Sequence, residues 1–220
     1  NLSPEVSTSA LINGHLKGQR AGWAIVGCYG DNLDSTAEKI VNTLGAPEDL
    51  SRWKELGVLI NYNGYGASID DLHFAPANLY ARLLPHNDPQ HCLDNDPDLI
   101  QTLRAAYGDD MRQAETAPRI IEENALSVVA FPDAPWARRV SGVYGNSLAN
   151  SVPDRAHAVL TEIPQGYLVS VRAPLNARQG ADELCRQFPT GGGRAAAAGI
   201  NELPTDRLDD FVEAMRKQFA

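Results

Sequence analysis

The pattern of apolar and polar residues changes in kind near residue 124. Before this point apolar residues recur mostly at helical spacing, and helices are predicted over residues 5–16, 35–44, 47–57, 72–84 and, with breaks, 97–124, with Ser3 and Pro47 among the start signals. After it, strands are predicted over 125–131, 156–160 and 166–172, and helices over 138–151, 182–187 and 208–219. This order predicts an α/β protein.

One apolar run in the first part has no helical spacing. Residues 22–29 are almost continuously apolar, and Gly30-Asp31-Asn32 follows at once. Such a run is typical of a buried parallel strand that ends in an acidic turn. From this pattern we expect residues 97–124 to form one or two helices that link two parts of the chain, and the residues from 125 to 220 to form an α/β domain close to the usual domain size.

Charge and composition limit the partners. The chain has 220 residues, of which 43% are hydrophobic, enough to bury a core. Its 28 acidic and 19 basic residues give a formal net charge of −9. This argues against a broad electrostatic grip on nucleic acid or anionic lipid, so any phosphate site must be local.

The compartment can also be inferred from composition. No apolar run approaches the roughly 18 residues of a membrane helix, and no signal pattern is present, so a soluble, cytoplasmic protein without a membrane partner is expected. Cys28, Cys92 and Cys185 are far apart in the sequence, which suggests neither a disulfide framework nor a zinc site. Because the chain begins with Asn1 rather than Met, we expect it to be a piece of a longer protein.

The sharpest local feature is a glycine triplet, Gly191-Gly192-Gly193, followed by Arg194 and an alanine run. Glycines let backbone N–H groups converge on an anion, Arg194 adds a forked donor, and the alanines are predicted to begin a helix whose dipole favours negative charge. The stretch therefore indicates a phosphate cradle. A flexible hinge before a packed helix is the alternative, and the lack of a following Lys-Ser/Thr excludes a Walker loop.

A second polar feature lies at the end of the strand predicted over 166–172. Alternation along a strand places Ser170 and Arg172 on one face and Val171 on the other. That face could hold a phosphate. The alternative for Arg172 is one half of a surface ion pair, which is a common and weak interaction.

Together these features resemble the DHH-associated substrate-binding domain of the DHH phosphoesterase superfamily. Its hallmark is Gly-Gly-Gly-His followed by Ala-Ala-Gly, matched here by Gly191 to Arg194 and Ala197-Ala198-Gly199. Arg194 stands in place of the family histidine, and an arginine can still bind phosphate. The resemblance covers about residues 125–220 and implies that substrate phosphate is held by Ser170, Arg172, Gly191, Gly192, Gly193 and Arg194.

The resemblance also makes residues 1–96 the C-terminal part of the DHH catalytic domain. It implies that they are the remnant of a parallel-sheet domain, joined by the helical linker 97–124 to a smaller α/β domain with a mixed sheet at 125–220. Residues 26–31 match the family's fourth metal-binding motif, which implies that Asp31 is a manganese ligand; a simple turn and cap is the alternative. The family's Asp-x-Asp and Asp-His-His motifs should precede this segment, and neither lies ahead of it. Two-metal hydrolysis needs several carboxylates and a histidine, so the chain is expected to be inactive alone.

The implied parent is a manganese-dependent hydrolase acting on a nucleotide, a short oligonucleotide or polyphosphate, with this part supplying phosphate binding. The alternative from another class is a non-catalytic nucleotide- or phosphate-binding regulatory module, and a third is a structural oligomerisation domain without phosphate affinity. A parallel sheet that lacks its preceding strands would expose an apolar edge, so a homodimer or partial disorder is expected in the first part.

Overall fold

The computed structural model describes residues 6–45 and 49–220, which form two compact units. The first unit extends to Asp109 and the second begins at Asp110. This boundary lies within helix α7 (Pro97–Glu115), inside the segment 97–124 that the sequence assigns to a linker. Within the described ranges, no helix combines the length and the apolar character needed to span a lipid bilayer.

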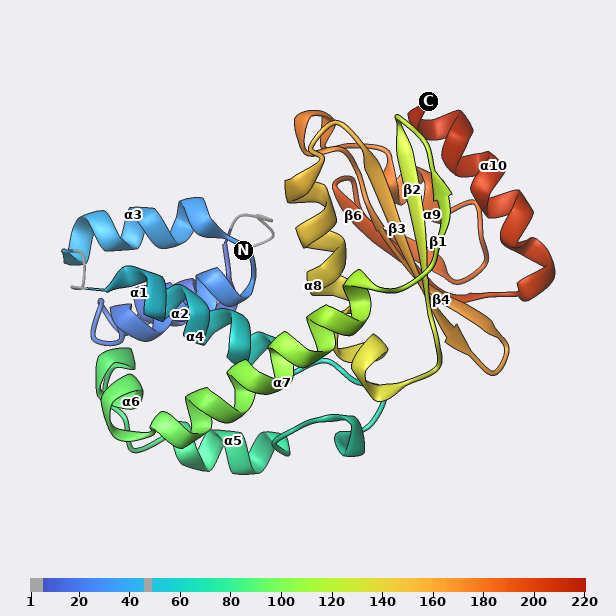
Figure 1. Ribbon diagram of the computed structural model, residues 1–220. Coiled ribbons are helices and arrows are strands. Elements are labelled where there is room, and N and C mark those ends of the chain that lie inside the picture. The colour runs from blue at the N-terminus through green and yellow to red at the C-terminus, as the bar shows by residue number, and fades with distance from the viewer. Residues whose placement is uncertain (1–5, 46–48) are drawn as a thin grey trace. The chain divides into compact units, whose positions relative to one another are not determined.

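The described part of the first unit is helical (Figure 1). Its helices are α1 (Thr8–His15), α2 (Ala21–Gly30), α3 (Asp34–Leu44), α4 (Leu50–Tyr62), α5 (Pro76–Leu83), α6 (Pro89–Asn95) and the first part of α7. The side chains of Ser7 and Asp49 cap α1 and α4. The start signals expected at Ser3 and Pro47 lie outside the described residues.

The strand predicted over 22–29 is wrong, because these residues form helix α2. Most side chains of α2 are buried, so the helix has no polar face, and periodicity alone does not separate a buried helix from a buried strand. Gly57 lets α4 approach α2 closely, since a Cβ at this position would lie 2.2 Å from the carbonyl oxygen of Val26. The described residues of this unit contain no sheet, so the exposed sheet edge that led us to expect a homodimer is not found among them.

The second unit is an α/β domain with a mixed sheet, and this confirms the predicted fold class. Its strands are β1 (Arg119–Glu122), β2 (Leu126–Phe131), β3 (Ala156–Ile163), β4 (Gly166–Arg172), β5 (Gly191–Arg194) and β6 (Ala197–Leu203). They follow the order β1-β2-β3-β4-β6-β5, in which β2 and β3 are parallel and all other neighbours antiparallel.

Helices cover both faces of this sheet (Figure 1). Helix α8 (Pro135–Ser151) connects the parallel strands β2 and β3 and packs on one face against β3 and β4. Helices α9 (Ala181–Cys185) and α10 (Leu208–Phe219) lie on the opposite face, where Leu184 and Phe211 pack against Ala158 and Val171 of the sheet. Because α8 covers mainly the middle of its face, the β4–β6–β5 side of that face remains only half-buried.

A buried serine–histidine pair joins β2 to β3. Ser127 Oγ lies 2.8 Å from His157 Nδ1, and His157 Nε2 lies 3.3 Å from the carbonyl oxygen of Val152. When the Nε2–H donates to that carbonyl, the neutral ring accepts the Ser127 hydroxyl at Nδ1. Burial of the ring lowers the pKa of His157 below its ordinary value.

We expect the second unit to lose stability as the pH falls below about 6.5, the ordinary histidine pKa. In this range the unfolded chain protonates His157 whereas the folded chain keeps it neutral. The stability that the neutral His157 contributes is therefore complete above the ordinary histidine pKa and is lost as the pH falls through the lower pKa of the folded state. Urea unfolding between about pH 7.5 and about pH 5.5 measures this slope. A His157→Gln variant should show a flatter slope, and parallel slopes for both proteins would contradict the assignment.

Candidate functional site

The glycine triplet forms an edge strand, so the predicted cradle of a loop and a helix is wrong. Gly191–Arg194 is strand β5, and it pairs antiparallel with β6 through a turn at Ala195 and Ala196. The alanine run begins β6 instead of a helix. No helix dipole therefore points at this stretch, and its capacity for anion binding rests on strand geometry and on Arg194.

The register of β4, β6 and β5 brings four of the predicted residues onto one face. Residues paired across neighbouring strands point to the same side of a sheet. One row consists of Ser170, Gly199 and Gly192, and the next of Arg172, Ala197 and Arg194. We call these two rows the small-residue face. The predicted residues Gly191 and Gly193 alternate with them and belong to the opposite side of the strand.

The fold explains the glycines at 191 and 193 but not the one at 192. A Cβ at Gly191 would lie 1.8 Å from the carbonyl oxygen of Cys185. Gly193 has a φ of +145°, and its Cβ would lie 2.5 Å from Ala198 Cα. A Cβ at Gly192 would meet no atom within 4 Å. Glycine inside a strand often marks the close approach of a ligand, and Gly192 has the open space for one.

Helix α8 holds the side chain of Arg172 in place. The Arg172 Nε–H donates to Asn146 Oδ1 at 2.6 Å, and a terminal guanidinium nitrogen donates to the carbonyl oxygen of Gly142 at 3.1 Å. The arginine stem passes close to Gly145, where a Cβ would lie in ordinary van der Waals contact with Arg172 Cγ, at 3.6 Å. Sequence reasoning missed Asn146, although the i, i+3 and i+4 spacing of 142, 145 and 146 places all three on one helix face.

Arg194 has a different environment. It is exposed, and the described residues give it no hydrogen bond or ion pair. Strand β6 separates β4 from β5, so the backbones of Arg172 and Arg194 are about 10 Å apart. A fixed guanidinium and an available one thus flank a floor of small residues, an arrangement suited to a phosphate or carboxylate group.

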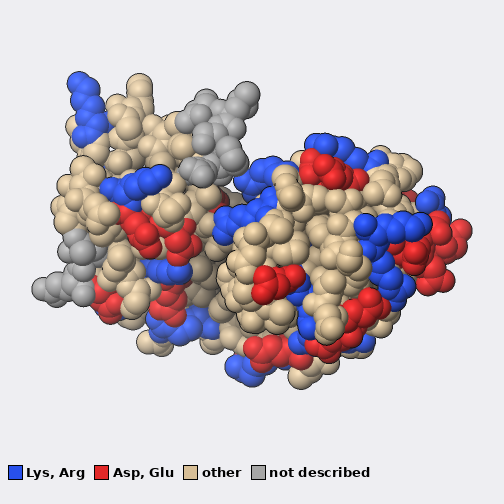
Figure 2. All heavy atoms as spheres, turned by 90° about the horizontal axis from the view of Figure 1, so that it is seen from above, with Lys and Arg blue, Asp and Glu red and all other residues tan. Residues whose placement is uncertain are grey.

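The surface that Figure 2 shows is not predominantly basic. In the view of Figure 2, small groups of Lys and Arg alternate with groups of Asp and Glu on both units. A long polyanion needs an extended basic surface, whereas a single phosphate needs only a few donors. The distribution in this view agrees with a local anion site.

The predicted metal ligand Asp31 follows the C-terminus of α2, not the end of a strand. It lines a small pocket of about 190 Å³ together with Gly27, Gly30, Gly57 and Asn61. The negative end of the helix dipole and a carboxylate both favour a cation there. Across residues 6–45 and 49–220, however, no group of three or more His, Cys, Asp or Glu could hold a metal ion, so the residues present do not form a two-metal site.

Two Asp-x-Asp tripeptides occur later in the chain, at residues 94–96 and 96–98. Their carboxylates are used in ion pairs: Asp96 and Asp98 with Arg82, and Asp94 with Arg52 at 3.7 Å. Asp96 also accepts the Leu99 N–H at the start of α7. These aspartates therefore stabilise the first unit locally.

The cysteine side chains lie inside the protein. All three are buried and free. Burial raises the pKa of Cys92 to about 11 and that of Cys185 to about 12. Both thiols are protonated at neutral pH, which makes them poor nucleophiles.

Comparison of the sequence with models of protein families and with curated proteins gives no match. Solved structures do resemble the chain. A DHH domain described as a member of the s1p family of ribosomal proteins has a TM-score of 0.60 at 13% identity, over 94% of this chain and 51% of that one. RecJ from Thermus thermophilus, in complex with Mg²⁺, has a TM-score of 0.52 at 19% identity, over 90% of this chain and 33% of RecJ.

A third similar structure is the pGpG-specific phosphodiesterase PggH from Vibrio cholerae, with a TM-score of 0.53 at 14% identity, over 83% of this chain and 72% of PggH. This chain thus spans about half of the first protein and about a third of RecJ. At such identities the likeness concerns the fold. The chain has the fold of the DHH-domain proteins, and its resemblance to the DHH phosphoesterase superfamily is confirmed at the level of that fold.

Proposed function

We propose that this chain is the C-terminal, substrate-binding part of a manganese-dependent phosphoesterase of the DHH type. Its substrate would be a nucleotide, a short oligonucleotide or polyphosphate, with one phosphate held on the small-residue face. The observation that carries the proposal is the glycine at position 192. A Cβ there would meet no atom within 4 Å, so packing does not require a glycine, and its absence leaves open space beside Ser170, Arg172 and Arg194.

The similar structures support the chemistry in outline. RecJ is in complex with Mg²⁺ in one structure and with Mn²⁺ in another, and PggH is a pGpG-specific phosphodiesterase. Asp31 would supply one ligand to such a metal. Because the described residues do not complete the site, the hydrolytic step belongs to parts of the parent protein other than these residues.

The residues of this chain would bind and orient. The Arg172 guanidinium already donates to Asn146 and to the carbonyl oxygens of Val171 and Gly142, so it would contribute a positive charge whose position needs no rearrangement when a phosphate arrives. Arg194 can turn toward the same group because no described partner holds it. The Ser170 hydroxyl lies one row away and can donate to a phosphate oxygen or a sugar hydroxyl.

A Gly192→Val substitution should weaken binding of a nucleoside monophosphate by about tenfold or more, about 1.4 kcal/mol, and leave folding intact. Valine suits a strand and has free space here, so it fills the ligand's place without a clash inside the protein. Titration calorimetry gives the affinity, and thermal unfolding checks the fold. Asn201→Val, at an exposed position of β6, is the matched control. Equal affinities of the Gly192→Val variant and the parent chain would contradict the site.

An Arg194→Ala substitution should weaken the same binding by about 1.5–3 kcal/mol, the scale of a charge-assisted hydrogen bond. The stability should not change, because the described structure gives Arg194 no partner. Arg186→Ala serves as control, since Arg186 lies at the end of α9 on the other side of the sheet and pairs with Asp182. Unchanged binding on loss of Arg194 would count against a phosphate role for this side chain.

The regulatory module remains the second candidate, because the small-residue face could hold a phosphate without hydrolysis. Titrations with and without manganese, combined with a turnover assay, address both. Binding without turnover that is insensitive to manganese fits a substrate-binding part separated from its catalytic centre, and manganese-dependent turnover by this chain alone would contradict our proposal. Asp-x-Asp and Asp-His-His in the coding sequence upstream would then favour the enzyme over the regulatory module.

A further inference from the structure

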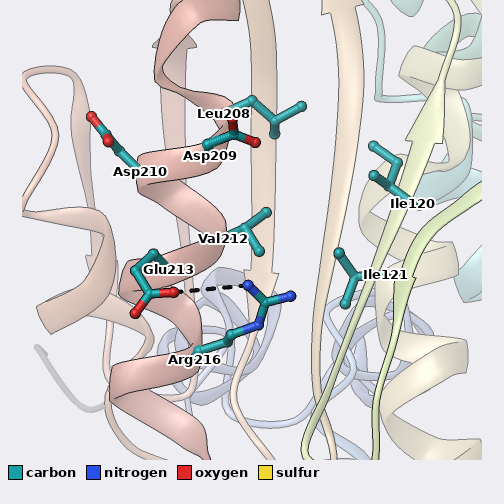
Figure 3. A pocket seen from close by; sticks show the side chains of 8 residues that line it. All are labelled: Ile120, Ile121, Leu208, Asp209, Asp210, Val212, Glu213 and Arg216. Carbon is teal, nitrogen blue, oxygen red and sulfur yellow. Dashed lines mark ion pairs between the residues drawn. The ribbon is translucent and has the colours of Figure 1, made fainter.

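A groove lies between the edge strand β1 and helix α10, on the face of the sheet opposite α8. It has a volume of about 460 Å³. Figure 3 shows Ile120 and Ile121 on one side and Leu208 and Val212 on the other, with Asp209, Asp210, Glu213 and Arg216 along the helix. We call this the β1–α10 groove. It is a feature of the second unit alone and is separate from the small-residue face.

The apolar wall on β1 depends on an irregularity in the strand. The pairing of β1 with β2 shifts register between Arg119 and Ile121. Successive residues of a regular strand point to opposite faces, but here both Ile120 and Ile121 line the groove. Ile120 is 42% exposed, whereas Ile121 is partly buried and packs against the core of the second unit. The irregularity thus leaves Ile120 exposed on the side of the strand that lines the groove.

The polar wall on α10 has excess negative charge. Of its four charged residues three are acidic and one is basic. Arg216 is already engaged, with Glu123 at 2.7 Å and with Glu213 at 3.8 Å. Asp210 pairs with Arg207, whereas Asp209 has no ion pair among the described residues. A group that enters beside α10 therefore meets carboxylates whose charge is only partly neutralised.

The exposed isoleucine and the acidic residues on α10 together indicate which kind of partner would fit this groove. We propose that the β1–α10 groove docks an extended segment of a partner protein in which bulky apolar side chains alternate with lysine or arginine. Its apolar side chains would cover Ile120, and its cations would lie next to Asp209 and Glu213. The outer edge of β1 has no neighbouring strand in the described sheet, so the segment has room to lie along it. An acidic segment or a nucleic acid backbone would be repelled by the same carboxylates.

The test uses short fluorescent peptides as probes and fluorescence anisotropy as the readout. In the first peptide leucine alternates with lysine, in the second with glutamate, and in the third serine replaces leucine. We expect the first to bind and the other two to bind at least about tenfold more weakly, since one has the wrong charge and the other lacks the apolar groups. Equal binding of the lysine and glutamate peptides would overturn the proposal.

Variants of this chain locate the binding. Ile120→Ser and Asp209→Lys should each weaken binding of the leucine–lysine peptide by about fivefold or more, and both side chains are exposed enough to be replaced without loss of the fold. Val152→Ser, at another exposed apolar position, and Glu202→Lys, on β6 far across the sheet, are the matched controls. If the controls weaken binding as much as the groove variants, the peptide binds elsewhere and the proposal fails.

A second copy of the chain is the competing occupant. Sedimentation velocity of the unliganded protein distinguishes it from a partner segment. A monomer agrees with a groove kept open for a partner. A dimer that Ile120→Ser dissociates would assign the groove to self-association and overturn the proposal.

Discussion

Replacing Arg139 by methionine is expected to lower the free energy of unfolding of the second unit by about 3–5 kcal/mol. Arg139 on α8 donates two hydrogen bonds to Asp110 on α7, with Nε to Oδ2 at 2.7 Å and a terminal nitrogen to Oδ1 at 3.0 Å. Only 10% of the arginine side chain and 5% of the aspartate side chain are exposed. The substitution therefore leaves a carboxylate buried without this counter-ion, which costs far more than the loss of a surface pair.

Arg138 provides the matched control, since it is the next residue on the same helix. It pairs with Asp133, whose side chain is 49% exposed, so Arg138→Met should cost less than about 1 kcal/mol. A double variant, Arg139→Met with Asp110→Leu, should recover most of the loss because no buried charge remains. Hydrogen exchange of the β2 to β4 amides reports on this unit alone. If these amides in the Arg139→Met variant exchange as slowly as in the parent protein, Asp110 tolerates the loss of Arg139 and the prediction is wrong.

The second large effect is expected from Gly193→Ala, which should destabilise the second unit by at least about 1–3 kcal/mol. The φ of +145° at Gly193 is strained for any residue with a side chain. A Cβ would also lie 2.5 Å from Ala198 Cα and 2.9 Å from the Ala197 carbonyl oxygen, so backbone would have to move. Urea unfolding measures the loss.

Gly192→Ala is the control for this prediction. It adds the same methyl group one residue earlier, where nothing lies within 4 Å, and should leave the urea midpoint unchanged. The two neighbouring glycines thus differ in which property they control, with Gly193 governing stability and Gly192 governing ligand affinity. If both alanine variants unfold at the same urea concentration, the distinction on which the candidate site depends is lost.

The second unit could be predicted from its sequence to a large extent. Strands β2, β3 and β4 and helices α8 and α10 agree with the predicted elements, because short β-rich runs indicate strands and an amphipathic helix has a clear period. The run at 22–29 has no such period, since α2 is buried almost all round. The structure assigns it to a helix, and tertiary packing against α4 through Gly57 decides this rather than local preference.

The candidate site likewise has features that follow from the sequence and others that only the tertiary structure reveals. The common face of Ser170 and Arg172 follows from strand alternation alone, and the structure confirms it. The place of Arg194 beside them does not follow, because glycine and alanine carry no apolar alternation that would indicate a strand. Only the pairing of β5 with β6 puts Arg194 in the row of Arg172. Asn146 needed the packing of α8 on β4 to be found.

The arginine at position 194 also affects how ligand binding should depend on pH. A histidine at this exposed place would gain or lose its charge near neutral pH, whereas a guanidinium stays charged throughout the physiological range. Arg172 carries the same group in the same row, so two guanidinium groups flank Ala197. The affinity of this face for a phosphomonoester should therefore vary with pH only as the ligand itself ionises, and a pH titration of binding would read the protonation of the bound molecule.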